Sequence, residues 1–408
     1  MRRPIVWAVL VAAAGAQTGS AYSVLTHEAV VDACWEVSLK PALQARYPGL
    51  TDGQLREAHA YAYGGAIIQD MGYYPFGSKL FSDLTHYIRS GGFVLTLLQD
   101  AQDADGYAFA LGALAHYAAD NNGHPIAINR AVPLLFPKLQ RKFGDEVTYE
   151  DDPSAHLKTE FGFDVIEIAH GNYAPQAYHD FIGFQVSKPL LETAFQDTYG
   201  VPLKSVFKDL DLALGTYRHV VSQIIPEMTK VAWDQKKDEI AKSTPGVTRR
   251  RFIYNLRRAS YEKEWGHVYE RPGIGARILA FFFHLIPKVG PFRALGFRVP
   301  QPAEETFLME SFNRTITAYR GYLAEVRTNR LQLPDRNLDT GRPLQAGAYY
   351  MADKAFAELL VKLAGEKAPV PAALRKEVLA FYPTPSVDLP AKARLELEAL
   401  RTETPASR

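Results

Sequence analysis

The sequence predicts an all-α protein that folds as a helical bundle. Apolar residues recur at helical spacing, most clearly at Tyr107, Leu111, Leu114 and Ala118 in the stretch from 105 to 120. Capping residues and Gly or Pro signals mark the ends of several such stretches. Few stretches alternate apolar and polar residues with the β-branched enrichment that is typical of strands. We therefore expect packed helices, with functional side chains held between facing helices.

The helices expected along the chain follow from these caps and breaks. They cover residues 27–46, 52–63, 105–120, a stretch opening at 156, one or two helices over 207–233 broken at Pro226, 304–327 and 349–365. Thr26 and Thr51 are the N-cap candidates of the first two helices. The Asn-Asn-Gly of residues 121–123 should end the third. Residues 69–75 carry a loop signal, which places Asp70 at a helix end or just beyond it.

The composition is that of a globular protein. The chain has 408 residues, of which 47% are hydrophobic and 22% charged, so a sizeable core and about two domains are expected. The formal net charge of +1 provides no overall field that would draw the whole protein onto nucleic acid or an anionic membrane. Cys34 is the only cysteine in the sequence, which excludes an intramolecular disulfide.

The N-terminal 21 residues have the pattern of a secretory signal peptide. Two arginines precede a mostly apolar stretch over residues 4–16, and the Gly-Ser-Ala of residues 19–21 provides the small residues of a cleavage site. The apolar stretch is too short to span a bilayer, which takes about 20 residues. We expect cleavage after Ala21, with a second candidate site after Ala16, and a secreted or periplasmic protein. Removing residues 1–21 leaves 44 basic and 45 acidic residues, so the mature chain is nearly neutral.

The C-terminal part carries two features of another kind. Five arginines with Phe252 and Tyr254 among them form a basic cluster over residues 249–258, and residues 278–286 form an apolar run with three successive phenylalanines. That run is too short to span a membrane. Residues 278–297 form either a buried segment beside a solvated basic face or an element that touches a lipid surface. Residues from Thr402 onward are expected to be disordered.

Histidines and carboxylates are concentrated between residues 70 and 160, which contain four of the eleven histidines. Two pairs, His116 with Asp120 and His156 with Glu160, have i, i+4 spacing and would lie on one face of a helix, about 5–6 Å apart at Cβ. Imidazole and carboxylate groups placed in this way can bind one metal ion and favour zinc or a similar divalent metal. Each pair by itself is more often an ion pair, so the prediction depends on the larger set.

That larger set resembles the zinc-dependent phospholipase C and S1/P1 nuclease superfamily. The residues that carry the resemblance are, in chain order, His27, Asp70, His86, His116, Asp120, His124, His156 and Glu160. The resemblance covers residues 22–160 and the helices up to about residue 240, and it implies a bundle of the phospholipase C/P1 nuclease type. The step from Asp120 to His124 is shorter than the usual spacing in the family.

The sequence indicates no alternative catalytic site with a serine or cysteine nucleophile. The chain has no G-x-S-x-G motif, and Cys34 lies outside the set of candidate ligands.

The resemblance also implies which residues hold three zinc ions. Asp70, His86, His116 and Asp120 would hold one ion, and His124, His156 and Glu160 would hold a second. Backbone atoms of Tyr22 and the side chain of His27 would hold the third, with Asp120 bridging. Tyr22 stands where the family usually has Trp, but its ligand atoms are backbone atoms, and His27 follows five residues later as in the nuclease branch. Asp70 would also be the base toward the attacking water.

This resemblance divides the chain into a signal peptide (1–21), a catalytic domain (22–240) and a helical C-terminal extension (241–408). It implies an exported zinc-dependent phosphodiesterase, and we expect phospholipid or a membrane surface as its partner. Members that act on choline lipids have aromatic residues beside the ligands, where this chain has Met71 and Asp83, so the headgroup preference stays open.

Two alternatives to a lipid-cleaving enzyme are kept. One is an S1/P1-like single-strand nuclease, although that branch carries disulfides and its base-stacking residues have no counterpart here. Nucleic acid is expected as a partner only under that alternative. The other is a zinc-stabilised lipid-binding protein without turnover. The sequence indicates no protein partner.

Overall fold

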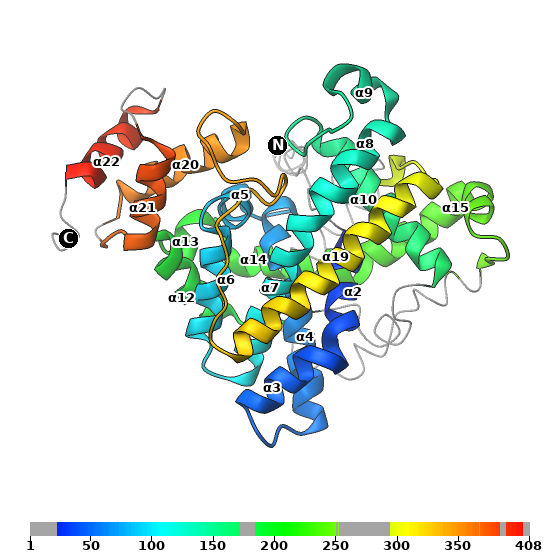
Figure 1. The fold of residues 1–408 in the computed structure, drawn as a ribbon, viewed down its shortest axis with the longest axis horizontal. Coiled ribbons are helices and arrows are strands. Elements are labelled where there is room, and N and C mark those ends of the chain that lie inside the picture. The colour runs from blue at the N-terminus through cyan, green and yellow to red at the C-terminus, as the bar shows by residue number, and fades with distance from the viewer. Residues whose placement is uncertain are drawn as a thin grey trace, which may run out of the picture.

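The computed structural model describes residues 23–171, 184–249, 252, 294–366, 368–383 and 389–402. In all of these ranges the regular structure is helical and no strand occurs, which confirms the all-α prediction (Figure 1). The α-helices are α2 (Val24–Cys34), α3 (Lys40–Arg46), α4 (Asp52–Ile68), α5 (Lys79–Tyr87), α6 (Ser90–Asp100), α7 (Ala104–Asn122), α8 (Asn129–Leu135), α9 (Pro137–Phe143), α10 (Pro153–His170), α12 (Lys188–Tyr199), α13 (Leu203–Val206), α14 (Leu210–His219), α15 (Ile225–Ser243), α19 (Pro302–Arg327), α20 (Tyr350–Leu363), α21 (Ala372–Phe381) and α22 (Ala391–Thr402). The irregular helical turns are η1 (Trp35–Leu39), η2 (Gln69–Tyr73), η3 (Gly123–Ile128) and η4 (Val220–Ile224).

Several expected helix ends differ from the structure for identifiable reasons. The first helix begins at Val24 with Ser23 at the N-cap, so the prediction of a cap at Thr26 was wrong. Thr26 is instead buried and donates its hydroxyl proton to Asp164, 138 residues away. The cap at Thr51 is confirmed and forms a full capping box with Gln54.

The α-helix α7 ends at Asn122, within the stop predicted at residues 121–123. The chain does not turn away there, however, but continues through η3, a π-helical turn, into α8. Such wide turns are often found at functional sites. Asp70 lies in η2, a 3-10 turn that directly extends α4, as expected for a residue at a helix end. Pro226 lies in the first turn of α15, after the π-helical turn η4.

The centre of the bundle is the crossing of α4 and α7, where the two backbones come unusually close. A Cβ atom added at Gly112 would lie 2.0 Å from the carbonyl oxygen of Ala62, and one added at Gly65 would lie 1.8 Å from that of Phe109. Only glycine permits this approach, since real Cβ contacts below 3.0 Å are essentially never seen. The crossing brings the C-terminal end of α4, and with it η2, next to the C-terminal half of α7.

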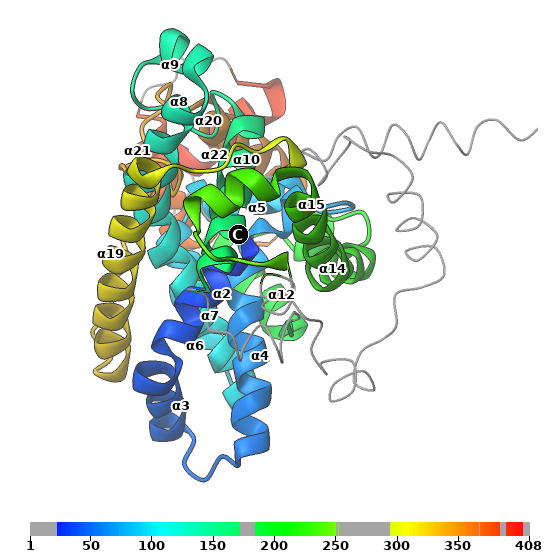
Figure 2. The ribbon, with the colours of Figure 1, turned by 90° about the vertical axis from the view of Figure 1, so that its right-hand side faces the viewer.

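The C-terminal helices pack onto this bundle at two places. Helix α19 runs along one edge of the bundle, against α7, η3 and α2 (Figure 2), and Tyr319 donates a hydrogen bond to the carbonyl oxygen of Leu111. Helix α20 packs against α5 and α22, and α21 packs against α12 and α22. The buried apolar cluster accordingly includes residues from Val24 to Leu400. The expected boundary near residue 240 stays a prediction.

Some predictions fall on residues that the structure does not describe. The signal peptide and Tyr22 lie outside the described ranges, as do the phenylalanines of the apolar run and most of the basic stretch. Within the described ranges, no helix combines the length and the apolar character that a membrane crossing requires.

Candidate metal centre

All eight side chains predicted as ligands within the described residues are buried, with at most 1% of their surface exposed. They are His27 on α2, Asp70 on η2, His86 on α5, His116 and Asp120 on α7, His124 on η3, and His156 and Glu160 on α10. Charged and imidazole groups rarely occur fully buried unless they are paired or bind metal. Their gathering from six separate elements therefore indicates a functional site.

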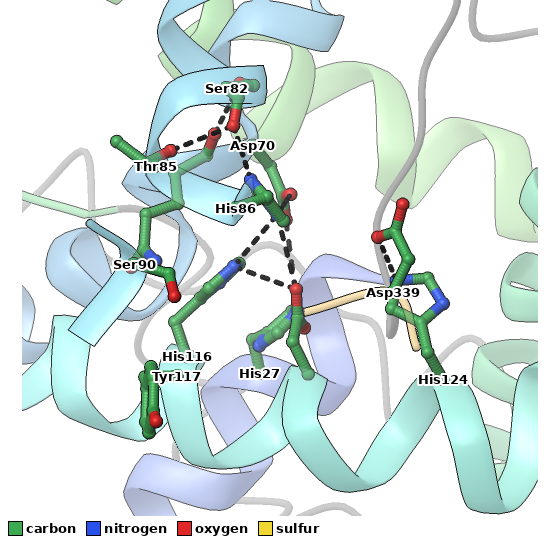
Figure 3. A network of polar contacts seen from close by, with 12 residues as sticks. His27, Asp70, Ser82, Thr85, His86, Ser90, His116, Tyr117, His124 and Asp339 are labelled. Atoms are coloured by element: carbon green, nitrogen blue, oxygen red, sulfur yellow. Dashed lines mark hydrogen bonds and ion pairs between the residues drawn. The ribbon is translucent and has the colours of Figure 1, made fainter. Parts of the chain in front are cut away.

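Four of these side chains form a tight cluster. His86 Nε2 and His116 Nε2 are each 3.2 Å from Asp120 Oδ2, and His86 Nε2 is 3.4 Å from Asp70 Oδ1 (Figure 3). The two Nε2 atoms are 3.3 Å apart. These spacings match the edge of a tetrahedron around zinc, about 3.3 Å for bond lengths of about 2.0–2.1 Å. The structure thus brings together the four residues predicted for the first ion.

The orientation of the two imidazoles is set by backbone carbonyl groups. His86 Nδ1 donates to the carbonyl oxygen of Ser82 over 2.8 Å, and His116 Nδ1 donates to that of Ala66 over 2.9 Å. A carbonyl oxygen can only accept, so Nδ1 carries a proton in each ring, and Nε2 is the nitrogen that would bind a metal after losing its own proton. Two imidazole Nε2 atoms and two carboxylates thus face one another, an arrangement that a divalent cation between them would stabilise in place of those protons. The residues present therefore fit a divalent metal.

The pKa values at this cluster show how strongly its groups interact. Burial would lower the pKa of His86, but the carboxylates of Asp120 and Asp70 outweigh burial and raise the pKa well above its usual range. Burial would raise the pKa of Asp120, but His116, His86 and His27 hold it well below its usual range. Strongly perturbed, mutually dependent groups of this kind are typical of functional sites.

His27 lies on the other side of the two carboxylates. Its Nε2 is 3.5 Å from Asp120 Oδ1 and 3.9 Å from Asp70 Oδ2, and its ring stacks on His116 with centroids 4.4 Å apart. Asp120 thus turns one oxygen toward His86 and His116 and the other toward His27. This geometry fits the bridging role predicted for Asp120, and Asp70 spans His86 and His27 in the same way.

The second predicted set is more widely spaced. His124 and His156 have ring centroids 5.7 Å apart, and His156 Nδ1 is 4.0 Å from Glu160 Oε1. In the described part of the chain, the groups whose donor atoms all lie within 4.8 Å of one another are His27–His116–Asp120 and Asp70–His86–His116. The second set is not among them, so its members are neighbours without forming an equally compact cluster.

The second set nevertheless holds several unsatisfied polar atoms. His156 Nε2 donates to the carbonyl oxygen of Val147 over 2.6 Å, which leaves Nδ1 of the same ring without a hydrogen bond among the described residues. The same holds for His124 Nδ1 and for both carboxylate oxygens of Glu160. Burial, together with the carboxylates of Asp70 and Asp120, raises the pKa of Glu160 well above its usual range. Buried polar atoms without partners call for an explanation, and a bound ion is one.

One residue of this region was missed by the sequence analysis. Asp339, between α19 and α20, is 3% exposed, and its Oδ1 is 3.2 Å from His124 Nε2 (Figure 3). Burial would raise the pKa of Asp339, but His124 lowers it to about 2. Asp339 is 215 residues from His124 and lies on no helix, so periodicity carries no signal for it; the only local signal is the turn-forming Asn-Leu-Asp-Thr-Gly of residues 337–341.

These observations define the class of protein. It is an all-α bundle whose centre carries a buried cluster of imidazoles and carboxylates of the kind that binds divalent metals. Residues 26–209 match the family described as zinc dependent phospholipase C. The match includes all eight buried donors from His27 to Glu160 and ends before Asp339. Comparisons with curated proteins and with solved structures gave no match.

Proposed function

We propose that this protein is an exported zinc-dependent phosphodiesterase that hydrolyses phospholipid as a phospholipase C does. The observation that carries the proposal is the facing pair of Nε2 atoms of His86 and His116, 3.3 Å apart and both next to Asp120. The match of residues 26–209 to the zinc dependent phospholipase C family supports the same class of hydrolase.

Each residue of the centre has a proposed role. Asp70, His86, His116 and Asp120 would hold one ion, His124, His156 and Glu160 a second, and His27 with Tyr22 a third. Bound zinc would supply Lewis-acid stabilisation of the phosphoryl group and activate water. Asp70 would accept the proton of the attacking water, because its carboxylate lies between His86 and His27 at the centre of the cluster. The carbonyl groups that bind the Nδ1 protons would keep the rings in the ligand tautomer.

Phospholipid is favoured by the aromatic residues next to the cluster. The ring of Tyr73 lies 5.7 Å from that of His86 and 5.8 Å from that of Tyr149, centroid to centroid. Phe76 follows on the same loop and is 40% exposed, and the loop is held to α14 by a hydrogen bond from Thr216 to the carbonyl oxygen of Pro75. Tyr73 and Tyr149 are buried, so they form an aromatic wall beside the cluster, with Phe76 at its exposed edge. We propose that this wall suits a lipid substrate, whereas a nuclease benefits from a basic groove, which the nearly neutral chain does not suggest.

The proposal is tested by comparing substrates with the mature, zinc-loaded protein. We expect vesicles of phosphatidylcholine or phosphatidylethanolamine to yield diacylglycerol and a phosphorylated headgroup, with little cleavage of single-stranded DNA or RNA. Efficient cleavage of nucleic acid with intact phospholipid would assign the protein to the nuclease branch. Zinc binding and vesicle binding without any product would instead identify a zinc-stabilised lipid-binding protein.

A pair of histidine variants on one helix controls for unspecific effects. His156→Ala removes a proposed ligand and should abolish turnover. His170→Ala, at the C-terminal end of the same helix, removes a half-buried imidazole that pairs with Glu167 and should leave turnover unchanged. Equal losses in both variants would indicate damage to α10 rather than loss of a ligand.

A further inference from the structure

We propose that Asp339 is a positioning residue of the second metal site, where it orients and polarises the imidazole of His124 for metal binding through Nδ1. The carboxylate would thus come from the C-terminal part of the chain, outside the family match, which ends at residue 209. This inference rests on the proposed metal centre, and it does not depend on the proposed substrate.

The first argument is a pattern shared by four histidines of the centre. In each ring one nitrogen faces a protein oxygen: His86 the carbonyl of Ser82, His116 that of Ala66, and His156 that of Val147. The oxygen facing His124 is Asp339 Oδ1, 3.2 Å from Nε2. The remaining nitrogen of His124, Nδ1, is buried and forms no hydrogen bond with the described residues. His124 therefore follows the same pattern, with a carboxylate in place of a backbone carbonyl.

The second argument is that the carboxylate of Asp339 is held firmly in this orientation. Its Oδ2 accepts hydrogen bonds from the hydroxyl groups of Tyr87 over 2.7 Å and Tyr349 over 2.6 Å. Both donors are buried, so Oδ2 is occupied and Oδ1 is the oxygen turned toward His124. A metal-binding histidine commonly donates its other N–H to a carboxylate, which fixes the ring and raises its basicity.

The third argument is that the backbone around Asp339 is tied to α5, which carries His86, and to α6 and α8, which pack against elements that carry ligands. Asn129, at the start of α8, donates its side-chain amide proton to the carbonyl oxygen of Asp339 over 2.9 Å. The backbone N–H of Leu338 donates to the carbonyl oxygen of His86 over 3.0 Å. Ser90 and Arg89 bind the same segment through Arg336 and Asp335. These contacts fix the position of the segment that carries Asp339 relative to His86 and His124.

The test measures zinc affinity rather than turnover, by competition with a chromophoric chelator. The relevant ion is the one lost in His156→Ala. Substitution of a residue that hydrogen-bonds to a metal ligand typically lowers the metal affinity by about 10–100-fold. Asp339→Asn keeps an acceptor for His124 but removes the charge, and we expect it to lower the affinity for this ion about tenfold. Asp339→Ala should lower the affinity further. Asparagine has the shape of aspartate, and the tyrosine hydroxyl groups can accept from its amide, so the variant should fold.

Two comparisons separate positioning from a merely structural role. Asp335→Asn changes the same charge on the same segment, but its carboxylate faces Arg89, so zinc affinity should be unchanged. In a His124→Ala background, Asp339→Asn should have no further effect on affinity. Equal losses in Asp335→Asn and Asp339→Asn, or an undiminished effect of Asp339→Asn without His124, would overturn the inference.

Substitution of the ion by Co²⁺ provides a second readout. Its visible spectrum reports the ligand set, and we expect Asp339→Asn to leave the spectrum unchanged at saturation, because Asp339 is not itself a ligand. A changed coordination spectrum would show that Asp339 binds the metal directly and would also overturn the positioning role. Zinc affinities as expected in a protein that cleaves no phospholipid would refute the proposed function but leave this inference standing.

Discussion

The close crossing of α4 and α7 predicts that Gly112→Ala damages both stability and the metal centre. The added Cβ would lie 2.0 Å from the carbonyl oxygen of Ala62, whereas ordinary contact begins at 3.4 Å, so the two backbones must separate locally by about 1.4 Å. Overpacking of this kind lowers the free energy of unfolding by about 1–3 kcal/mol, and the higher helix propensity of Ala offsets at most about 1 kcal/mol of this loss. We expect a net destabilisation of about 1–2 kcal/mol and a melting temperature a few degrees lower.

The same displacement should reach the metals. Ala66, one turn after Ala62 on α4, accepts the hydrogen bond that fixes the ring of His116, at 2.9 Å. If the helices move apart, that bond lengthens and the zinc affinity of the first site should fall along with the melting temperature. Thermal unfolding by circular dichroism and chelator competition measure the two effects in one preparation.

A matched glycine elsewhere provides the control. A Cβ added at Gly321, on the exposed face of α19, meets nothing within 4 Å, so Gly321→Ala should be neutral or stabilising by up to about 1 kcal/mol. If Gly112→Ala kept the wild-type melting temperature and zinc affinity, the backbone contact would not limit the helix spacing, and the explanation of the crossing given above would be wrong.

Three further predictions concern the N-terminus and the metals. Sequencing of the mature protein should begin at Tyr22; a start at Gln17 or an intact Met1 would remove the third ion from the proposal. Metal analysis of protein purified without chelator should give more than two zinc ions per chain, and Asp120→Ala should lose more than one, because its two oxygens face different histidines at 3.2 and 3.5 Å; loss of a single ion would argue against bridging. Zinc affinity should fall as the pH is lowered, because the raised pKa of His86 keeps a proton on the metal-free site that zinc must displace. Calorimetry near neutral pH in buffers of different ionisation enthalpy should detect that proton, and binding without proton release would contradict the assignment.

The amino-acid sequence by itself predicted the helical class and eight side chains that the structure brings together in its centre. Local periodicity is enough for α7, and i, i+4 spacing is enough to place His116 with Asp120 on one face of it, because both follow from the geometry of a single helix. The resemblance to the zinc-dependent phospholipase C and S1/P1 nuclease superfamily then selected His27 and Asp70, whose positions relative to the others depend on the whole fold.

Only the tertiary structure decided the features that depend on contacts between distant segments. Thr26 does not cap its helix because Asp164 provides a buried partner for its hydroxyl. The α-helix α7 ends at the predicted stop, but the chain continues there as a π-helical turn into α8, which no local pattern indicated. Asp339 reaches His124 because α19 and α20 dock on the bundle and carry the connecting segment across α5. No local pattern encodes such a contact, since its free energy comes from packing and hydrogen bonds that form only when the chain has folded.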